Sequence, residues 1–175
     1  MTSHPIALAA LRASLALLIS TGGAALAHAD ASCNPVYDAG IKQLQTPHHV
    51  YTTRSGHAGH AAQKSETIYA GGVEYMQLDG RWQRSRLTAA EMLASAQEKR
   101  KTSAEGETCK ALGDEKVGDA AASVYSLHND DGVDSRLWLA ESDGSLLRQT
   151  ITLPDGSTVD SRYDYANVQA PLDVR

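Results

Sequence analysis

The sequence contains no phenylalanine, and its aromatic residues are seven tyrosines and two tryptophans. Each of these side chains carries a hydroxyl or an indole N–H that needs a hydrogen-bond partner when it is buried. We therefore expect that a cavity built from them is partly polar.

Motifs typical of enzymes are also missing. The sequence has no G-x-S-x-G, no H-E-x-x-H, no phosphate-binding loop, no dinucleotide fingerprint and no C-x-x-C pair. The net charge is −5 at pH 7 without a dense basic stripe, which disfavours nucleic-acid binding because phosphate neutralisation dominates that affinity. We expect a protein that is not an enzyme, binds no nucleic acid and needs no cofactor.

The first 29 residues have the pattern of a secretory signal peptide. The amino terminus and Arg12 are positive, an apolar run covers 13–19, and small residues lead to Ala27-His28-Ala29. This order predicts cleavage before Asp30 and export, which we take to be to the periplasm. Gly22-Gly23 interrupts the long apolar run that a membrane anchor needs. A retained anchor and a lipoprotein acylated at Cys33 stay open as alternatives.

The mature chain, residues 30–175, has the length of a single domain. Without Arg12, 15 basic side chains stand against 21 acidic ones, a net charge of about −6. Both cysteines, Cys33 and Cys109, lie in this part. An even count in an oxidising compartment predicts a disulfide between them.

Two segments have helical patterns. Asn34-Pro35 predicts a helix start, and apolar residues at helical spacing follow until Thr46-Pro47. The second helix is expected from Thr88 to about Ser103, because Thr88 and Glu91 have the spacing of a capping box.

The other apolar segments alternate with a two-residue period and predict strands. Turn signals such as Asp79-Gly80 and Asp143-Gly144 separate them, which favours antiparallel pairing of sequential strands. The expected strands are 49–53, 67–69, 73–78, 81–83, 124–127, 137–139, 147–153 and 159–165. These elements predict an α+β domain, a curved antiparallel sheet with two helices packed on one face.

Several segments together resemble the LolA-like superfamily of periplasmic lipoprotein-localisation and lipid-carrier proteins. The resemblance covers nearly the whole mature chain and rests on the helix ending in Thr46-Pro47, the run 75–82 before the capped helix, and the late segments 136–139, 144–148 and 163–165. It implies an incomplete β-barrel whose helices act as a lid over a hydrophobic interior. The lack of phenylalanine implies a smaller and more polar interior than three acyl chains require.

The leading hypothesis is a periplasmic carrier for a hydrophobic or amphipathic ligand, such as an acyl chain, a lipid or a lipoprotein. The ligand is expected between the concave sheet face and the helices, with contacts from Tyr75, Trp82, Met92, Tyr125, Trp138 and Tyr163. The alternative is a non-enzymatic envelope protein with a filled core that binds a protein partner or acts as a sensor. In either case we expect a monomer. Sheet-to-helix packing is the simpler explanation for the aromatic residues.

Four histidines, His48, His49, His57 and His60, lie within 13 residues of one another. Neutral imidazole binds zinc, copper and nickel, so the segment is a weak candidate for a metal site. No cysteine or carboxylate lies nearby to complete a closed site, and a solvated loop explains the segment equally simply.

Overall fold

The computed structural model describes residues 29–55, 61–102 and 106–174. The predicted signal peptide, residues 1–29, lies outside this part of the chain except for Ala29. Two helices and nine strands follow one another as α1 (Ala29–Gln43), β1 (His48–Ser55), β2 (Gln63–Ala70), β3 (Val73–Leu78), β4 (Arg81–Arg84), α2 (Ala89–Thr102), β5 (Glu107–Val117), β6 (Ala120–Asn129), β7 (Asp134–Ala140), β8 (Leu146–Thr152) and β9 (Thr158–Asp164). In these residues, neither helix is long and apolar enough to span a membrane.

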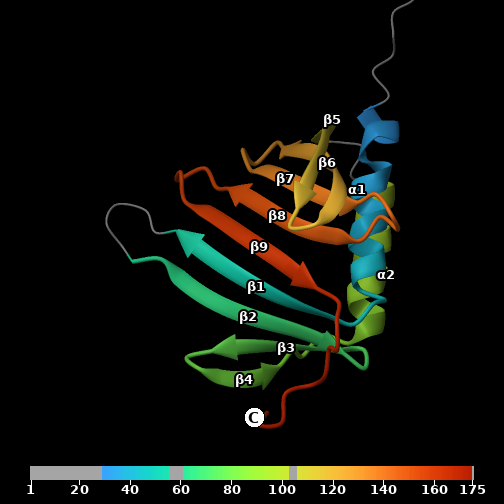
Figure 1. Ribbon diagram of the computed structural model, residues 1–175. Coiled ribbons are helices and arrows are strands. Elements are labelled where there is room, and N and C mark those ends of the chain that lie inside the picture. Colours follow the sequence, from blue (N-terminus) through green and yellow to red (C-terminus); the bar gives the residue numbers. More distant parts are fainter. Residues whose placement is uncertain (1–28, 56–60, 103–105, 175) are drawn as a thin grey trace, which may run out of the picture.

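The strands form one antiparallel sheet in the order β4-β3-β2-β1-β9-β8-β7-β6-β5. Strands that follow one another in the chain pair with each other, except for β4 and β5, which α2 separates in the sequence. The last strand, β9, also pairs with β1. Among the described strands, β4 and β5 do not pair with each other, so the sheet is an incomplete barrel. Both helices lie together along one side of it (Figure 1). The predicted α+β fold class is confirmed.

The local signals explain most of the elements. Asp79 and Gly80 both have positive φ, 50° and 72°, as the predicted hairpin between β3 and β4 requires. The capping box also forms, because Thr88 N–H donates to Glu91 Oε2 at 2.8 Å and Glu91 N–H donates to Thr88 Oγ1 at 3.2 Å.

The helix α1 begins earlier than the sequence predicts. It starts at Ala29, so Pro35 lies inside it and Asn34 is not its N-cap. The small residues before Pro35 are compatible with a helix, and Pro35 removes only one backbone N–H donor from it. The predicted start at Asn34 is therefore wrong.

The register assigns each strand residue to one of two faces. We call the face that α1 packs on the helix face and the opposite one the outer face. On β7, Leu137 and Leu139 belong to the core cluster with α1, whereas Trp138 packs with Val124 in a second cluster. Successive strand residues point to opposite faces, so these assignments extend across the paired strands.

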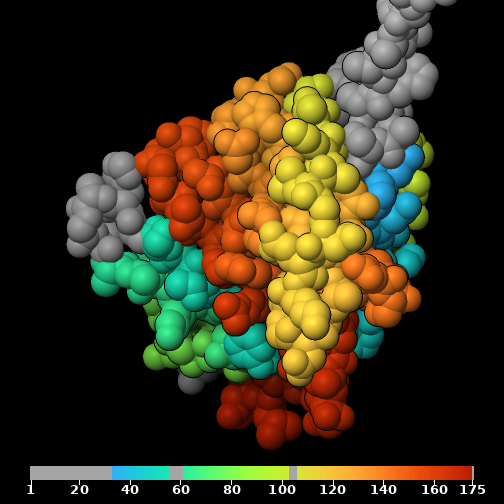
Figure 2. Space-filling model, turned by 45° about the horizontal axis from the view of Figure 1, so that its top comes forward, coloured from blue at the N-terminus to red at the C-terminus, as the bar shows by residue number. Residues whose placement is uncertain are grey.

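The helix α1 is fixed to the sheet by apolar packing and by one covalent bond. Its inward residues Val36, Tyr37 and Ala39 are buried against Leu137, Leu139 and Leu146. Cys33 is joined to Cys109 of β5 in a disulfide, which confirms the predicted pair. Figure 2 shows the β5–β6 hairpin (yellow) extending across the molecule beside α1 (blue).

Candidate functional site

The second helix lies against the first and is held only loosely to the sheet. None of its residues is buried, and it packs on α1 more than on any strand. Ion pairs secure its last turn: Lys99 Nζ lies 2.9 Å from Glu107 Oε1, and Arg100 Nη1 lies 2.6 Å from Asp38 Oδ1. Space is therefore left between α2, α1 and the strands below.

This space is a cavity of about 340 Å³, which we call the groove. Its floor is the helix face of β6, β7 and β8, with Leu127, Leu137 and Ile151. One wall is α1, and α2 contributes Ala96. Gly40 of α1 also lines the groove, and a Cβ atom added there would meet nothing within 4 Å. The small side chains at 40 and 96 are one reason why the space stays open.

The floor also carries uncharged polar groups. Ser135 pairs with Ile151 and Gln149 pairs with Leu137, so polar and apolar side chains alternate across β7 and β8. Gln149 Oε1 accepts a hydrogen bond from the Tyr163 hydroxyl at 3.4 Å. The groove is thus apolar with a few hydrogen-bonding groups, which is the common character of small-molecule sites.

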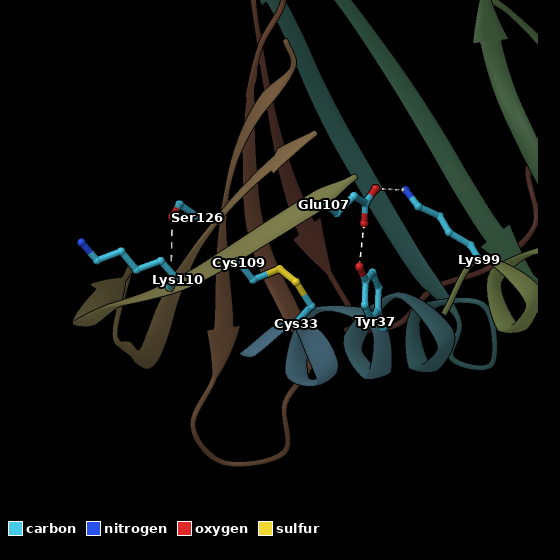
Figure 3. The surroundings of a disulfide bond; sticks show 7 residues. All are labelled: Cys33, Tyr37, Lys99, Glu107, Cys109, Lys110 and Ser126. Carbon is cyan, nitrogen blue, oxygen red and sulfur yellow. Dashed lines mark hydrogen bonds and ion pairs between the residues drawn. A yellow bond between two sulfur atoms is a disulfide. The ribbon is translucent and has the colours of Figure 1, made fainter. Parts of the chain in front are cut away.

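One carboxylate lies at the end of the groove where α2 meets β5. The Glu107 side chain is only 9% exposed, and both of its oxygens are bonded: Oε1 to Lys99 and Oε2 to the Tyr37 hydroxyl at 2.7 Å. Figure 3 shows the side chains of Tyr37 and Lys99 both pointing toward Glu107, with the Cys33–Cys109 disulfide nearby. The negative charge is therefore matched locally by a cation and a hydroxyl donor.

A histidine is buried beside the carboxyl end of α1. His48 is 4% exposed, its ring stacks on Tyr69 with centroids 5.5 Å apart, and its Nδ1 lies 2.8 Å from the Thr46 carbonyl. Its Nε2 lies 3.3 Å from the Gln43 amide nitrogen, so a neutral ring with the proton on Nδ1 satisfies both contacts. Burial lowers the pKa of His48 below its ordinary value.

Three of the six predicted ligand contacts lie on the helix side of the sheet. Tyr125 and Tyr163 are partly buried against the α1 core cluster, and Met92 is half-buried on α2. Burial raises the pKa of Tyr163 to about 12. Tyr125 lines a separate cavity of about 290 Å³, beside the loop between β7 and β8.

The other three predicted contacts lie on the outer face. Tyr75 and Trp82 share the register parity of His49, whose ring centroid is 6.4 Å from that of Trp82. Trp138 is packed on Val124 and lies on the outer face as well. None of the six residues is among those that line the groove. The structure does not bring them to one site, and their role as ligand contacts stays a prediction.

The histidine segment is divided by the fold. His48 is on the helix face and His49 on the outer face, where His49 Nε2 lies 3.1 Å from Glu66 Oε2. His57 and His60 lie outside the described residues. In the described part of the chain, no group of three or more His, Cys, Asp or Glu side chains could hold a metal ion.

Sequence reasoning did not identify the groove residues. Around Leu137 and Ile151 the sequence alternates between apolar and polar residues, which predicts strands. This alternation does not show where a cavity remains between the strands and the helices. Lys99 is one of three basic residues in the last turn of α2, and nothing in the sequence pairs it with Glu107.

No protein-family model matches the sequence, and comparison with curated proteins finds no match. Among solved structures, MucB in complex with MucA(peri) is similar with a TM-score of 0.51 and 15% identity, over 81% of this chain and 60% of that one. The lipoprotein LppX of Mycobacterium tuberculosis has a TM-score of 0.48 and 12% identity, over 80% of this chain and 100% of that one. A LolA superfamily protein from Nitrosomonas europaea has a TM-score of 0.29 and 10% identity, over 78% of this chain and 91% of that one. At 15% identity the likeness to MucB is one of fold alone.

Proposed function

We propose that this protein is an exported carrier that holds one hydrophobic or amphipathic chain in the groove. The observation that carries the proposal is the apolar cavity of about 340 Å³ between α1, α2 and the helix face. Ligand sites usually measure about 300–1,000 Å³, so the groove suits a small or single-chain ligand. Each buried methylene of an acyl chain contributes about 0.8 kcal/mol.

The arrangement supports binding without covalent chemistry. Leu127, Leu137 and Ile151 on the floor provide apolar contact, and the two cysteines are bonded to each other and supply no thiol nucleophile. We therefore propose a carrier that is not an enzyme. The signal pattern of residues 1–29 supports export to the periplasm, where a carrier keeps apolar cargo out of water.

A second candidate is a protein-interaction module of the envelope. It is favoured by the small volume of the groove and by the fact that MucB, which shares the fold, is recorded in complex with MucA(peri). Crosslinking in cells distinguishes the two: one protein partner and no extracted lipid support the module, whereas lipid without a partner supports the carrier.

The carrier proposal is tested with two substitutions at one position. Gly40→Leu places a branched side chain in the groove from the α1 side, whereas Gly40→Ala adds one methyl group in open space. Alanine at this helical position stabilises by about 0.5–1 kcal/mol relative to glycine. We expect the leucine variant to lose binding of a fluorescent acyl probe and the alanine variant to retain most of it.

Native mass spectrometry of protein purified from its own envelope provides the second measurement. A bound single-chain lipid in the wild-type protein, absent from the Gly40→Leu variant, supports the proposal. An empty wild-type protein that also fails to bind acyl probes contradicts it.

A further inference from the structure

The groove is electrically balanced by its own side chains. Of the residues that line it, only Lys99 and Glu107 carry charges, and they form an ion pair with each other. The remaining polar lining consists of neutral groups, among them Ser135 and Gln149. A charged ligand group entering the groove therefore finds no unpaired counter-charge.

The ion pair is difficult to open. Glu107 is 9% exposed at its side chain, and its second oxygen already accepts the Tyr37 hydroxyl hydrogen bond. A ligand anion that took Lys99 away would leave this buried carboxylate without its cation, which is strongly unfavourable. A ligand cation that paired with Glu107 would displace Lys99, whose side chain is 61% exposed and can return to water. The ligand cation would still have to lose its own hydration in the groove, which is unfavourable.

Neutral hydrogen-bonding groups meet a different environment on the floor. Among the described residues, the Ser135 hydroxyl forms no hydrogen bond, and Gln149 uses only its oxygen, as the acceptor for Tyr163. The hydroxyl and the amide N–H₂ are therefore available to a ligand hydroxyl, ester or amide. Leu137 and Ile151, opposite them in the register, provide the apolar contact for a chain.

We propose that the groove selects a single-chain amphiphile with an uncharged hydrogen-bonding head, and that the Lys99–Glu107 pair sets this preference. The inference rests on the proposed carrier function, because it concerns the same groove. It specifies the chemical class of the cargo: a monoacylglycerol-like, fatty-alcohol or fatty-amide ligand in preference to a fatty-acid anion or an alkylammonium ion.

The test compares three ligands with the same chain and different heads. Binding of monolaurin, lauric acid and laurylamine to the full mature protein is measured by titration calorimetry at about pH 8, where the acid is ionised and the amine protonated. We expect monolaurin to bind at least about tenfold more tightly than either charged ligand. Equal affinities, or tighter binding of a charged ligand, overturn the inference and leave the carrier function standing. If none of the three binds, the carrier function fails and the inference with it.

Two variants test the role of the ion pair. Glu107→Gln leaves Lys99 unmatched, so lauric acid should gain about tenfold relative to monolaurin. Lys99→Met leaves Glu107 unmatched, so laurylamine should gain instead. Arg100→Met is the matched control, because it removes the neighbouring α1–α2 ion pair with Asp38, which does not line the groove. Its ligand preference should equal that of the wild type.

Thermal melting establishes that each variant is folded. Lys99 is largely exposed, so Lys99→Met tests the inference even if Glu107→Gln does not fold. Unchanged preference in a folded Lys99→Met protein overturns the assignment of selectivity to the ion pair.

Discussion

Glu107 and Cys109 lie two residues apart on the same face of β5, and together they hold both helices. Cys109 is bonded to Cys33 of α1, and Glu107 is ion-paired with Lys99 of α2. The start of a strand at the sheet edge thus anchors both elements that enclose the groove (Figure 3). One anchor is covalent and the other is electrostatic, and they should respond to different treatments.

Reduction of the disulfide should lower stability clearly. Cys33 and Cys109 are separated by 76 positions, so the cross-link stabilises by about 4 kcal/mol in the chain-entropy model. We expect the melting temperature of the wild-type protein to fall when reductant is added. The Cys33→Ser, Cys109→Ser double variant should melt at the lower temperature and ignore reductant. A wild-type melting temperature that reductant leaves unchanged contradicts this role.

Acid should weaken the fold through His48. Its pKa is lowered in the folded state by burial, whereas in the unfolded chain it titrates near 6.5. The unfolded state therefore binds the proton more readily, and the stability contribution is complete above about pH 6.5 and is lost as pH falls through the folded-state pKa. Denaturant unfolding between about pH 7.5 and pH 5 measures the change. His48→Asn should flatten the pH dependence, and an unaltered slope would be evidence against the assignment.

Two adjacent residues of β7 should separate stability from binding. Trp138 is 5% exposed, and its indole N–H donates to Glu115 Oε2 at 2.8 Å. Trp138→Ala should lower the free energy of unfolding by about 3–5 kcal/mol. It should not change the affinity for an acyl probe, because the Trp138 side chain is on the outer face. Leu137→Ala should lower the free energy of unfolding by about 2–5 kcal/mol and should also weaken binding of the acyl probe, since Leu137 lines the groove. Equal loss of affinity in both variants would contradict the assignment of faces.

Removal of the α2 cap should have a local effect. Thr88 and Glu91 satisfy each other's backbone N–H groups, and no residue of α2 is buried. Thr88→Ala should therefore raise amide hydrogen exchange several-fold across α2 while the melting temperature changes little. Thr102→Ala, at the other end of the same helix, serves as the control. A large drop in melting temperature would show that α2 is part of the cooperative core.

The sequence predicts both helices and eight of the nine strands, because these elements depend on local signals, and it predicts the disulfide because only two cysteines are present. The exception is β5, where nearly all residues of Glu107–Val117 are exposed and apolar alternation is absent. An edge strand paired on one side needs little apolar periodicity, so the pattern could not reveal it. The start of α1 was misplaced for a related reason: Pro35 normally marks a first turn, and nothing local indicates that the helix continues upstream of it.

The candidate site was harder to predict because it depends on which face each residue occupies. Tyr75, Trp82 and Trp138 are aromatic and lie in strands, yet their register turns them away from the helices. A shift of one residue along a strand reverses its faces, and the sequence does not say which face the helices cover. The small residues at 40 and 96 help to keep the groove open, and no sequence motif marks them.

The position of the two tryptophans decides what intrinsic fluorescence can report. Both indoles belong to the outer face. The guanidinium carbons of Arg136 and Arg148 lie 4.9 and 4.8 Å from the centroid of the Trp138 ring, and Trp82 lies beside Val174 on the edge strand β4. Emission should therefore follow unfolding but stay nearly silent when a ligand enters the groove. The same two residues make natural donors for energy transfer, with Trp138 reporting the β7 side of the sheet and Trp82 the β4 edge.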